Sequence, residues 1–303
     1  QGTLGTVIGT ETTNTTVQDS LGNKVVVPAG FKVQNPDKTV PDGIVIEDIS
    51  HEATKGSEFV WIPVGTVNRA GGEPVTINLS RYTFDTTGKE TDQGDKIVET
   101  YYQELATSDK GNTTAKDINA FKTSAVKNKG YYIGRYEART ATKRTAKGDA
   151  LTQLTEKPGD YVYNLVIQSQ ASERSQKMYA ENSNFTSDLV NSYAWDTAIT
   201  FLQTFDNRAE EAKTKPYSQQ NSLNSSFAEK GTNQLETKDI ICNIYDMASN
   251  MFEWSTETFS NPDSPYVCRG GRSYNTSFCT SIRYNYSTTF SKDSNAFRPF
   301  LYL

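Results

Sequence analysis

Residues 246–254 read DMASNMFEW and decide the fold of this chain. The run IICNIYD at 240–246 leads into them, and both this run and the closing residues MFEW are strand-like. Three further motifs accompany this stretch, and we call all four the landmarks of the sequence. They are FVWIPVG at 59–65, YIGRYE at 132–137, and RGG at 269–271 followed by FRP at 297–299. Because the landmarks occur in this order, and because residues 59–64 and 297–303 at the two ends are apolar, we predict one compact domain over residues 58–303, with its last strand close to its first.

Length and composition favour a globular, sheet-rich protein and argue against nucleic-acid-binding and membrane-spanning proteins. With 303 residues, 35% hydrophobic and 11% aromatic, the chain can bury a core, and its many Thr, Asn, Ser and Tyr residues favour sheet and polar loops over a helical bundle. A net charge of −5 and the lack of a basic stripe argue against a nucleic-acid partner. No stretch reaches the ~18 apolar residues of a membrane span, so we expect no membrane contact by this fragment. Residue 1 is Gln and no signal peptide is present, so we expect a mature or trimmed form that has lost any N-terminal anchor.

Local patterns predict a β-rich beginning and a few helices. Residues 1–57 are expected to form an extended, β-rich N-terminal segment with Pro- and Gly-containing turns. Helical spacing predicts helices near 98–106, at 115–126 and within 187–205. Asn191 or Ser192 can cap the third of these helices. Residues 206–236 are rich in Gln, Asn and Ser, which predicts a long loop.

The cysteines and the single histidine offer little chemistry. Cys242, Cys268 and Cys279 do not have the spacing of a metal site. Cys242 and Cys268 lie in apolar runs, which fits either two small core residues or a disulfide between them, and Cys279 is expected to be an exposed, incidental thiol. His51 is the one histidine of the chain, so His-based metal sites and Ser-His-Asp catalysis are not expected.

The composition of residues 273–290, SYNTSFCTSIRYNYSTTF, resembles that of an antibody paratope. This window contains no Lys, Glu, Gln, Met or Trp and consists mainly of Ser, Thr, Tyr, Asn and Phe. Tyr provides rigid contact area at a low cost in entropy, and Ser and Asn provide adaptable hydrogen bonds. The residues found here are also those whose codons end in a pyrimidine, which is the outcome of mutating adenines in Asn codons.

Alternation within the window indicates which aromatic side chains lie together. Tyr284 and Tyr286 have the spacing that puts two residues on one face of a strand, while Ile282 is expected in the core. Arg283 fits either a ligand contact or a scaffold role. If the tyrosines of the window are buried, the binding face is expected on the long loop 206–236 instead.

The four landmarks together resemble the formylglycine-generating-enzyme/sulfatase-modifying domain, which has a C-type-lectin-like fold. The usual third landmark of that family is DMxGNVxEW, and here Ser249 and Met251 replace its Gly and Val, while Ala296 replaces the Gly of the usual GFR ending. The resemblance implies an α+β protein with a C-type-lectin-like domain over residues 58–303, large polar loop insertions, and residues 1–57 as a short β-rich N-terminal extension.

Within that superfamily the chain looks most like the variable proteins of diversity-generating retroelements. Their variable region lies between RGG and FRP, here about residues 272–295. The resemblance implies a non-enzymatic, extracellular binding or adhesion protein on a phage or a bacterial surface, with a protein or glycan ligand that stays unidentified. The ligand-binding residues it implies are Ser273, Tyr274, Asn275, Thr276, Ser277, Phe278, Thr280, Tyr284, Tyr286, Thr288 and Phe290, with Tyr274, Tyr284 and Tyr286 as anchors. The alternative is a structural pilin-like or phage tail-tip subunit that uses the fold for assembly.

Other prominent residues fit a scaffold better than a site. These scaffold residues are Asn250, Glu253, Trp254, Gly270, Gly271 and Arg298. The Trp is expected to fill the core, and the Asn and Glu to satisfy backbone groups of loops. The two glycines are expected to form a turn that begins the variable segment, and the Arg to hold the final strand through hydrogen bonds.

An oxidase of the formylglycine-generating type is not expected. The resemblance places the two catalytic cysteines of that enzyme at about Asn275 and Thr280, where this chain has none, and nothing near Cys279 in sequence activates its thiol. No cofactor is therefore expected. A structural calcium ion stays open, because C-type-lectin-like folds often bind one, although no EF-hand spacing occurs in this sequence.

Overall fold

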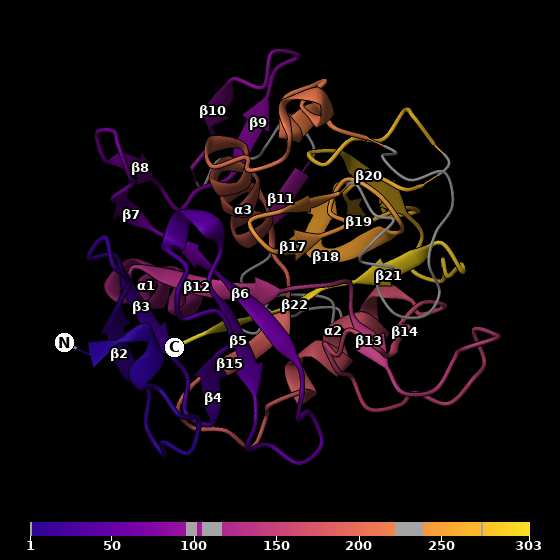
Figure 1. Ribbon diagram of the computed structural model, residues 1–303. Coiled ribbons are helices and arrows are strands. Elements are labelled where there is room, and N and C mark those ends of the chain that lie inside the picture. Colours follow the sequence, from indigo (N-terminus) through magenta and orange to yellow (C-terminus); the bar gives the residue numbers. More distant parts are fainter. Residues whose placement is uncertain (1, 95–101, 105–116, 222–238, 274) are drawn as a thin grey trace.

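Two β-sheets lie at the centre of the molecule (Figure 1). The computed structural model describes residues 2–94, 102–104, 117–221, 239–273 and 275–303. The larger sheet is antiparallel throughout, with the strand order β15-β22-β12-β6-β5-β4. Its strands are β15 (Thr186–Leu189), β22 (Pro299–Tyr302), β12 (Gly130–Gly134), β6 (Glu58–Pro63), β5 (Val45–Asp48) and β4 (Phe31–Val33). Every residue of β6 is buried, as its continuous apolar run predicts.

The second sheet is formed mainly by strands between residues 252 and 297. Its strand order is β11-β18-β19-β20, and β21 pairs in parallel with the first half of β18. The strands are β11 (Tyr102–Glu104), β18 (Phe252–Phe259), β19 (Tyr266–Arg269), β20 (Arg283–Tyr286) and β21 (Asn295–Phe297). Within the described residues, β20 pairs only with β19, so it is an edge strand.

Short strand pairs and 3-10 turns surround the two sheets. A three-stranded sheet joins β1 (Gly2–Thr3), β2 (Thr15–Gln18) and β3 (Lys24–Val27). The two-stranded pairs are β7 (Gly65–Val67) with β8 (Val75–Ile77), β9 (Tyr82–Phe84) with β10 (Glu90–Asp92), β13 (Arg139–Thr140) with β14 (Tyr161–Val162), and β16 (Ile240–Ile241) with β17 (Ile244–Tyr245). The 3-10 turns are η1 (Leu4–Thr6), η2 (Val40–Asp42), η3 (Glu210–Ala212) and η4 (Tyr217–Gln219).

Three α-helices among the described residues pack around the sheets: α1 (Ile118–Asn128), α2 (Gln168–Lys177) and α3 (Ser192–Thr204). Helix α3 contacts β6 of the larger sheet and β18 of the second, so it connects the two (Figure 1). Its first turn is capped by Asn191, whose side chain accepts a hydrogen bond from the Ala194 N–H at 2.9 Å, as the sequence predicted. The mixed α+β class is thereby confirmed.

The last strand of the chain and the strand of the first landmark lie in the same, larger sheet. Strand β22 pairs with β12, and β12 pairs with β6, so the last strand lies one strand away from β6 rather than beside it. Strands β4 and β5, from residues 1–57, also belong to this sheet, because β5 pairs with β6. The boundary drawn after residue 57 therefore falls between two hydrogen-bonded strands.

One expected helix is wrong. Residues 102–104, which were expected inside a helix near 98–106, form strand β11, because they pair with the second half of β18. The helix at 115–126 is confirmed, with bounds Ile118–Asn128.

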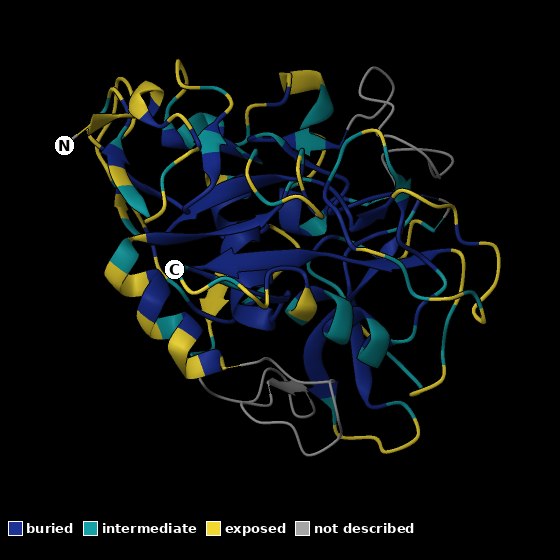
Figure 2. Ribbon diagram, turned by 90° about the horizontal axis from the view of Figure 1, so that it is seen from below, coloured by how far each residue is buried: buried dark blue, intermediate teal, exposed yellow. Residues whose placement is uncertain are grey.

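Burial follows the sheets. Strands at the centre of the molecule are buried, and exposed residues gather in the loops and turns around them (Figure 2). One apolar cluster extends from Leu4 to Tyr302 and contains Trp61, Trp195 and Trp254. Among the described residues, no helix combines the length and apolar character that a membrane crossing requires.

Candidate ligand-binding face

The C-terminal window forms the edge of the second sheet. Strand β20 pairs with β19 in the register Tyr266↔Tyr286 and Cys268↔Tyr284. Because side chains alternate along a strand, Tyr284 and Tyr286 share one face and Arg283 lies on the other. The two tyrosine rings are 5.1 Å apart, as the spacing in the sequence predicted.

Four aromatic side chains form an aromatic row along this face. They are Phe278, Tyr284, Tyr286 and Phe290. The Phe278 and Tyr284 rings are 4.9 Å apart and nearly perpendicular, and the Tyr286 and Phe290 rings are stacked at 3.7 Å. Tyr284 is 40% exposed, and the other three are half-buried. The row therefore presents aromatic edges and faces to solvent in fixed positions.

Buried aromatic residues of β18 support the aromatic row from below. Phe252 lies 4.7 Å from Phe278 and is stacked on Tyr284 at 6.1 Å. Trp254 lies 6.0 Å from Tyr286, and its indole N–H donates to the Val166 carbonyl at 3.0 Å. Since both supporting rings are fully buried, the row cannot shift without disturbing the core.

Polar side chains of the window surround the aromatic row. Thr276, Ser277 and Thr288 are exposed, and Asn275 is half-buried with its side chain accepting from the Ser277 N–H at 2.8 Å. Tyr274, an expected anchor, lies outside the described residues.

Two residues expected on the exposed face are buried. Ser273 is 1% exposed, and its N–H donates to the Asn250 carbonyl at 3.2 Å. Thr280 is fully buried, donates through its N–H to the Gln220 carbonyl at 3.0 Å, and accepts from the Trp195 indole at 2.9 Å. Both are therefore scaffold positions rather than ligand-binding positions, because their backbone groups hydrogen-bond to the loop before β18 and to α3.

Arg283 fastens β20 to the interior. Its guanidinium group donates to Glu257 at 2.8 Å and to Asp196 of α3. Arg269 of β19 also pairs with Asp196, and Arg81 pairs with Glu257 at 2.8 Å. The Arg283 side chain is 6% exposed, so its geometry fits a scaffold role rather than a ligand contact.

The electrostatics of this cluster favour the charged form of Asp196. Burial alone raises the pKa of Asp196, but the nearby Arg269 and Arg283 outweigh burial and lower that pKa below its usual value. Burial lowers the pKa of Arg283, and the stronger attraction of Asp196 and Glu257 raises it. The two arginines therefore keep Asp196 in the form that pairs with them.

The RGG landmark packs directly against the DMASN loop. Gly270 has a φ of +81°, and a Cβ on it would lie 2.5 Å from the Met247 carbonyl. A Cβ on Gly271 would lie 2.0 Å from the Ala248 carbonyl. Only glycine permits this approach, and the turn it makes directs the chain into the window.

The remaining landmark residues lie in the interior beneath the window. Glu253 and Arg298 form two hydrogen bonds of 2.6 and 2.8 Å, and Arg298 also donates to the backbone carbonyls of Gly134 and Tyr245. Asn250, at a φ of +62°, donates to the buried Glu137. These bonds join β12, β17, β18 and the segment that precedes β22.

The cysteines do not pair. Cys242, Cys268 and Cys279 are free, and burial raises the pKa of the first two thiols. Cys279 is half-buried, 3.5 Å from the Ser281 hydroxyl. In the part of the chain that the structure describes, no group of three or more His, Cys, Asp or Glu side chains is placed to hold a metal ion.

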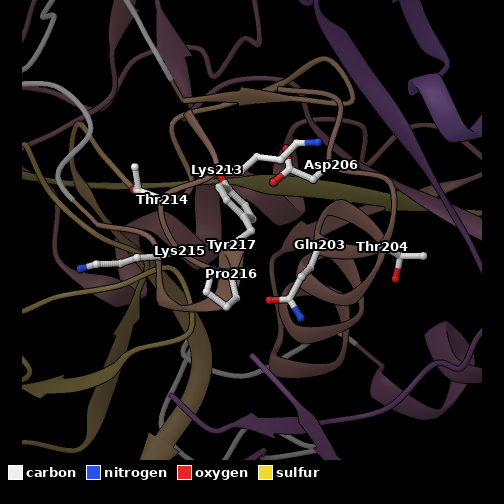
Figure 3. Close-up of a pocket in the computed structure, with 8 residues that line it drawn as sticks. All are labelled: Gln203, Thr204, Asp206, Lys213, Thr214, Lys215, Pro216 and Tyr217. Atoms are coloured by element: carbon white, nitrogen blue, oxygen red, sulfur yellow. The ribbon is translucent and has the colours of Figure 1, made fainter. Parts of the chain in front are cut away.

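A shallow cleft lies on the described part of the long loop, residues 206–221, that was the alternative binding face (Figure 3). Its volume is about 390 Å³, and its lining includes Asp206, Lys213 and Tyr217. Lys213 pairs with Glu210 at 2.7 Å, and Tyr217 is buried with its hydroxyl donating to Asp239 at 2.8 Å. The cleft therefore lacks the exposed aromatic anchor that the aromatic row has.

No protein-family model and no curated protein matches this sequence. The structure is similar to "Treponema denticola variable protein 1", with 14% identity, a TM-score of 0.38, and coverage of 81% of this chain and 96% of that one. It is also similar to PvdO from Pseudomonas aeruginosa, with 11% identity, a TM-score of 0.42, and coverage of 82% of this chain and 95% of that one. A variable protein is thus among the structures that this chain is similar to. Neither likeness is close enough to assign a function.

Proposed function

We propose that the chain is a non-enzymatic, C-type-lectin-like ligand-binding protein whose segment 272–295 is diversified by a retroelement. The observation that carries this proposal is the aromatic row, surrounded by exposed hydroxyl and amide side chains and held on an ion-paired strand. The protein would act outside the cell, on a bacterial surface or a phage particle, where a pilus or tail assembly serves as its carrier. Its ligand is a protein or a glycan.

The aromatic row has the properties of a set of binding anchors. Interfaces draw most of their energy from a few aromatic or Arg side chains at rigid positions. Tyr284 and Tyr286 are already held by Phe252 and Trp254, so little side-chain entropy is lost when a ligand covers them. The surrounding Thr and Ser side chains then set specificity, because a polar group buried without a partner is penalised.

The window also separates positions that can change from positions that cannot. Its inward-facing residues Ser273, Thr280 and Arg283 are tied to the scaffold through the bonds described above. Its outward-facing residues, such as Thr276 and Thr288, are exposed, and changes at such positions usually alter stability by no more than about 0.5 kcal/mol. A mutagenic process can therefore vary the surface while the fold is kept.

Two displayed libraries test the proposal. The first randomises the outward positions Asn275, Thr276, Ser277, Tyr284 and Tyr286. We expect most of its members to fold with near-original melting temperatures and selection against an arbitrary protein, such as lysozyme, to yield binders. The second library randomises the inward positions Ser273, Thr280 and Arg283, and we expect it to lose folded protein. Equal loss of folding in both libraries would contradict the proposal.

An oxidase function lacks its reactive pair in this chain. Asn275 and Thr280 occupy the positions where the formylglycine-generating enzymes have cysteines, and Thr280 is buried. Incubation of the purified protein with copper and a sulfatase-type Cys peptide should give no formylglycine. Copper-dependent product that disappears in Cys279→Ser would overturn the non-enzymatic reading.

A further inference from the structure

A small recess lies on the other side of β20 from the aromatic row. Its volume is about 270 Å³, and its lining residues are Thr83, Phe84, Gln219, Cys279, Ser281, Ile282 and Arg283. Thr83 and Phe84 belong to β9, and Gln219 to η4, so one wall comes from outside the diversified segment. Because Arg283 and Tyr284 point to opposite faces of β20, the recess and the aromatic row are separate surfaces.

The described lining of the recess presents no available charge to a ligand. Arg283 is the one charged side chain among its described lining residues, and its guanidinium group is engaged by Glu257, Asp196 and the Tyr82 carbonyl. Across the β9–β10 pair, Glu90 lies opposite Phe84 and Asp92 opposite Tyr82, so carboxylates flank this wall. An anionic ligand would be repelled by the carboxylates and would find no available cation in this lining.

Polar groups of the recess retain capacity for hydrogen bonds. The Thr83 hydroxyl accepts from Gln93 at 3.1 Å, and its own proton can still be donated. The Ser281 hydroxyl donates to the Ser218 carbonyl at 2.8 Å, and the lone pair that the Cys279 thiol does not use can still accept. Gln219 donates to the Phe84 carbonyl at 3.5 Å, a bond so long that it is readily exchanged. Phe84 and Ile282 are the apolar residues among those that line the recess.

We propose that this recess binds one neutral, hydroxyl-bearing ring, such as a hexose or N-acetylhexosamine unit of a glycan. Its volume is just below the ~300 Å³ at the lower end of ligand pockets, which suits a single ring. A sugar ring has C–H faces that pack against an aromatic side chain and hydroxyl groups that pair with Thr, Ser and Gln. The proposal stands apart from the diversified face, since the aromatic row can bind a partner with the recess empty.

Cys279 provides a reporter in the wall of the recess. Cys242 and Cys268 are fully buried, so in the native protein alkylation by iodoacetamide should be confined to Cys279. The rate of its alkylation, followed by peptide mass spectrometry, is measured with glucose, galactose, mannose and N-acetylglucosamine, and with glucuronic and sialic acids. We expect saturable slowing by at least one neutral sugar and none by the acids. No slowing by any neutral sugar, or stronger slowing by an acid, overturns the proposal.

Near-isosteric variants then locate the bound ring. Thr83→Val and Gln219→Met keep side-chain size, and we expect each to raise the half-saturating sugar concentration about tenfold, which corresponds to about 1.4 kcal/mol. Tyr284→Ala, on the opposite face of β20, should leave that concentration unchanged. Saturation-transfer NMR of Cys279→Ser repeats the comparison without the thiol. Loss of sugar binding in Tyr284→Ala with retention in Thr83→Val and Gln219→Met would place the sugar on the aromatic row and refute the recess as its site.

Discussion

Arg283 and Tyr284 are neighbours in the chain, but their side chains belong to different parts of the molecule. Arg283 is nearly buried and bound to two carboxylates, whereas Tyr284 is the most exposed member of the aromatic row. The pleat of a single edge strand is sufficient to separate an interior position from a surface position. The window is therefore a layer with two faces, and mutations should act differently on each.

Substitutions at Trp254 and at the outer threonines should differ sharply in their effect on stability. Trp254 is fully buried, so Trp254→Ala should lower the free energy of unfolding by roughly 3–5 kcal/mol. Thr276→Ala with Thr288→Ala should change it by less than about 1 kcal/mol, because both residues are exposed. Urea denaturation of the three proteins measures both effects. Similar losses in the two variants would show that the window is part of the core.

The composition of residues 273–290 identified this window, but it could not show which of its residues are buried and which are exposed. Ser and Thr fit an exposed surface, and they fit the interior equally well once their polar groups have partners. Thr280 finds such partners in Gln220 and Trp195, which are far from it in sequence. The local sequence does not indicate which distant residues will be hydrogen-bond partners, so the burial of Thr280 and Ser273 could not be predicted. The placement of Tyr284 and Tyr286 on one face could be predicted, because it depends only on the two-residue repeat of a strand.

At the level of the element, ion pairs hold strand β20 in place. It has one neighbouring strand among the described residues, and its interior face is held by the pairs of Arg283 with Asp196 and Glu257. Removing one partner of a buried ion pair leaves the other charge uncompensated. The strand that supports the aromatic row is thus held to α3 electrostatically.

Arg283→Met should therefore destabilise the protein by about 3–5 kcal/mol. The matched control is Lys292→Met, which removes an exposed cation from the same segment and should change stability by no more than about 0.5 kcal/mol. Urea denaturation and amide hydrogen exchange of β20 provide the measurements. If both variants had the same stability, β20 would have to be held by its backbone pairing with β19 alone.

Elements with strong apolar spacing were predictable, and elements fixed by distant pairing were not. Helix α3 has apolar residues at helical spacing and an Asn cap, and both signals lie in its own sequence. Helix α2 (QSQASERSQK) has one buried apolar residue, Ala171, so no hydrophobic period revealed it. Strand β11 was mistaken for helix because its state is set by pairing with β18, about 150 residues away in sequence.

At the level of the whole molecule, a buried carboxyl links stability to pH. Burial raises the pKa of Glu156 well above 4.5, its ordinary value, so the folded protein keeps a proton that the unfolded chain releases. The stability that this group contributes is complete below pH 4.5 and is lost as pH rises toward the raised folded pKa. Glu156→Gln cannot ionise and should become increasingly stable relative to the original protein as the pH rises above 4.5.

Denaturation midpoints across that pH range test the effect. The matched control is Glu181→Gln, an exposed position, whose difference from the original protein should stay constant with pH. A constant difference for Glu156→Gln as well would show that the Glu156 carboxyl is ionised inside the folded protein.

Removing the strands that follow the window should abolish folding. A chain that ends at Phe290 lacks β21 and β22, and β22 holds β15 and β12 together through its fully buried residues Phe300 and Leu301. We expect poorly dispersed amide resonances and rapid proteolysis. Removing residues 1–3, which include the exposed strand β1, should leave a folded protein. A folded chain ending at Phe290 would mean that the larger sheet can close without β22.

If residues 272–295 are diversified as we propose, the position of β22 restricts which variants can fold. The ribosome makes β21 and β22 after the window, and the larger sheet stays divided until β22 arrives between β15 and β12. A frameshift or stop codon inside the window changes or removes both strands, and proteases then meet a chain with exposed apolar faces. Only variants that preserve the reading frame would be displayed. Under that proposal, the requirement for β22 would remove truncated variants before any ligand could select among them.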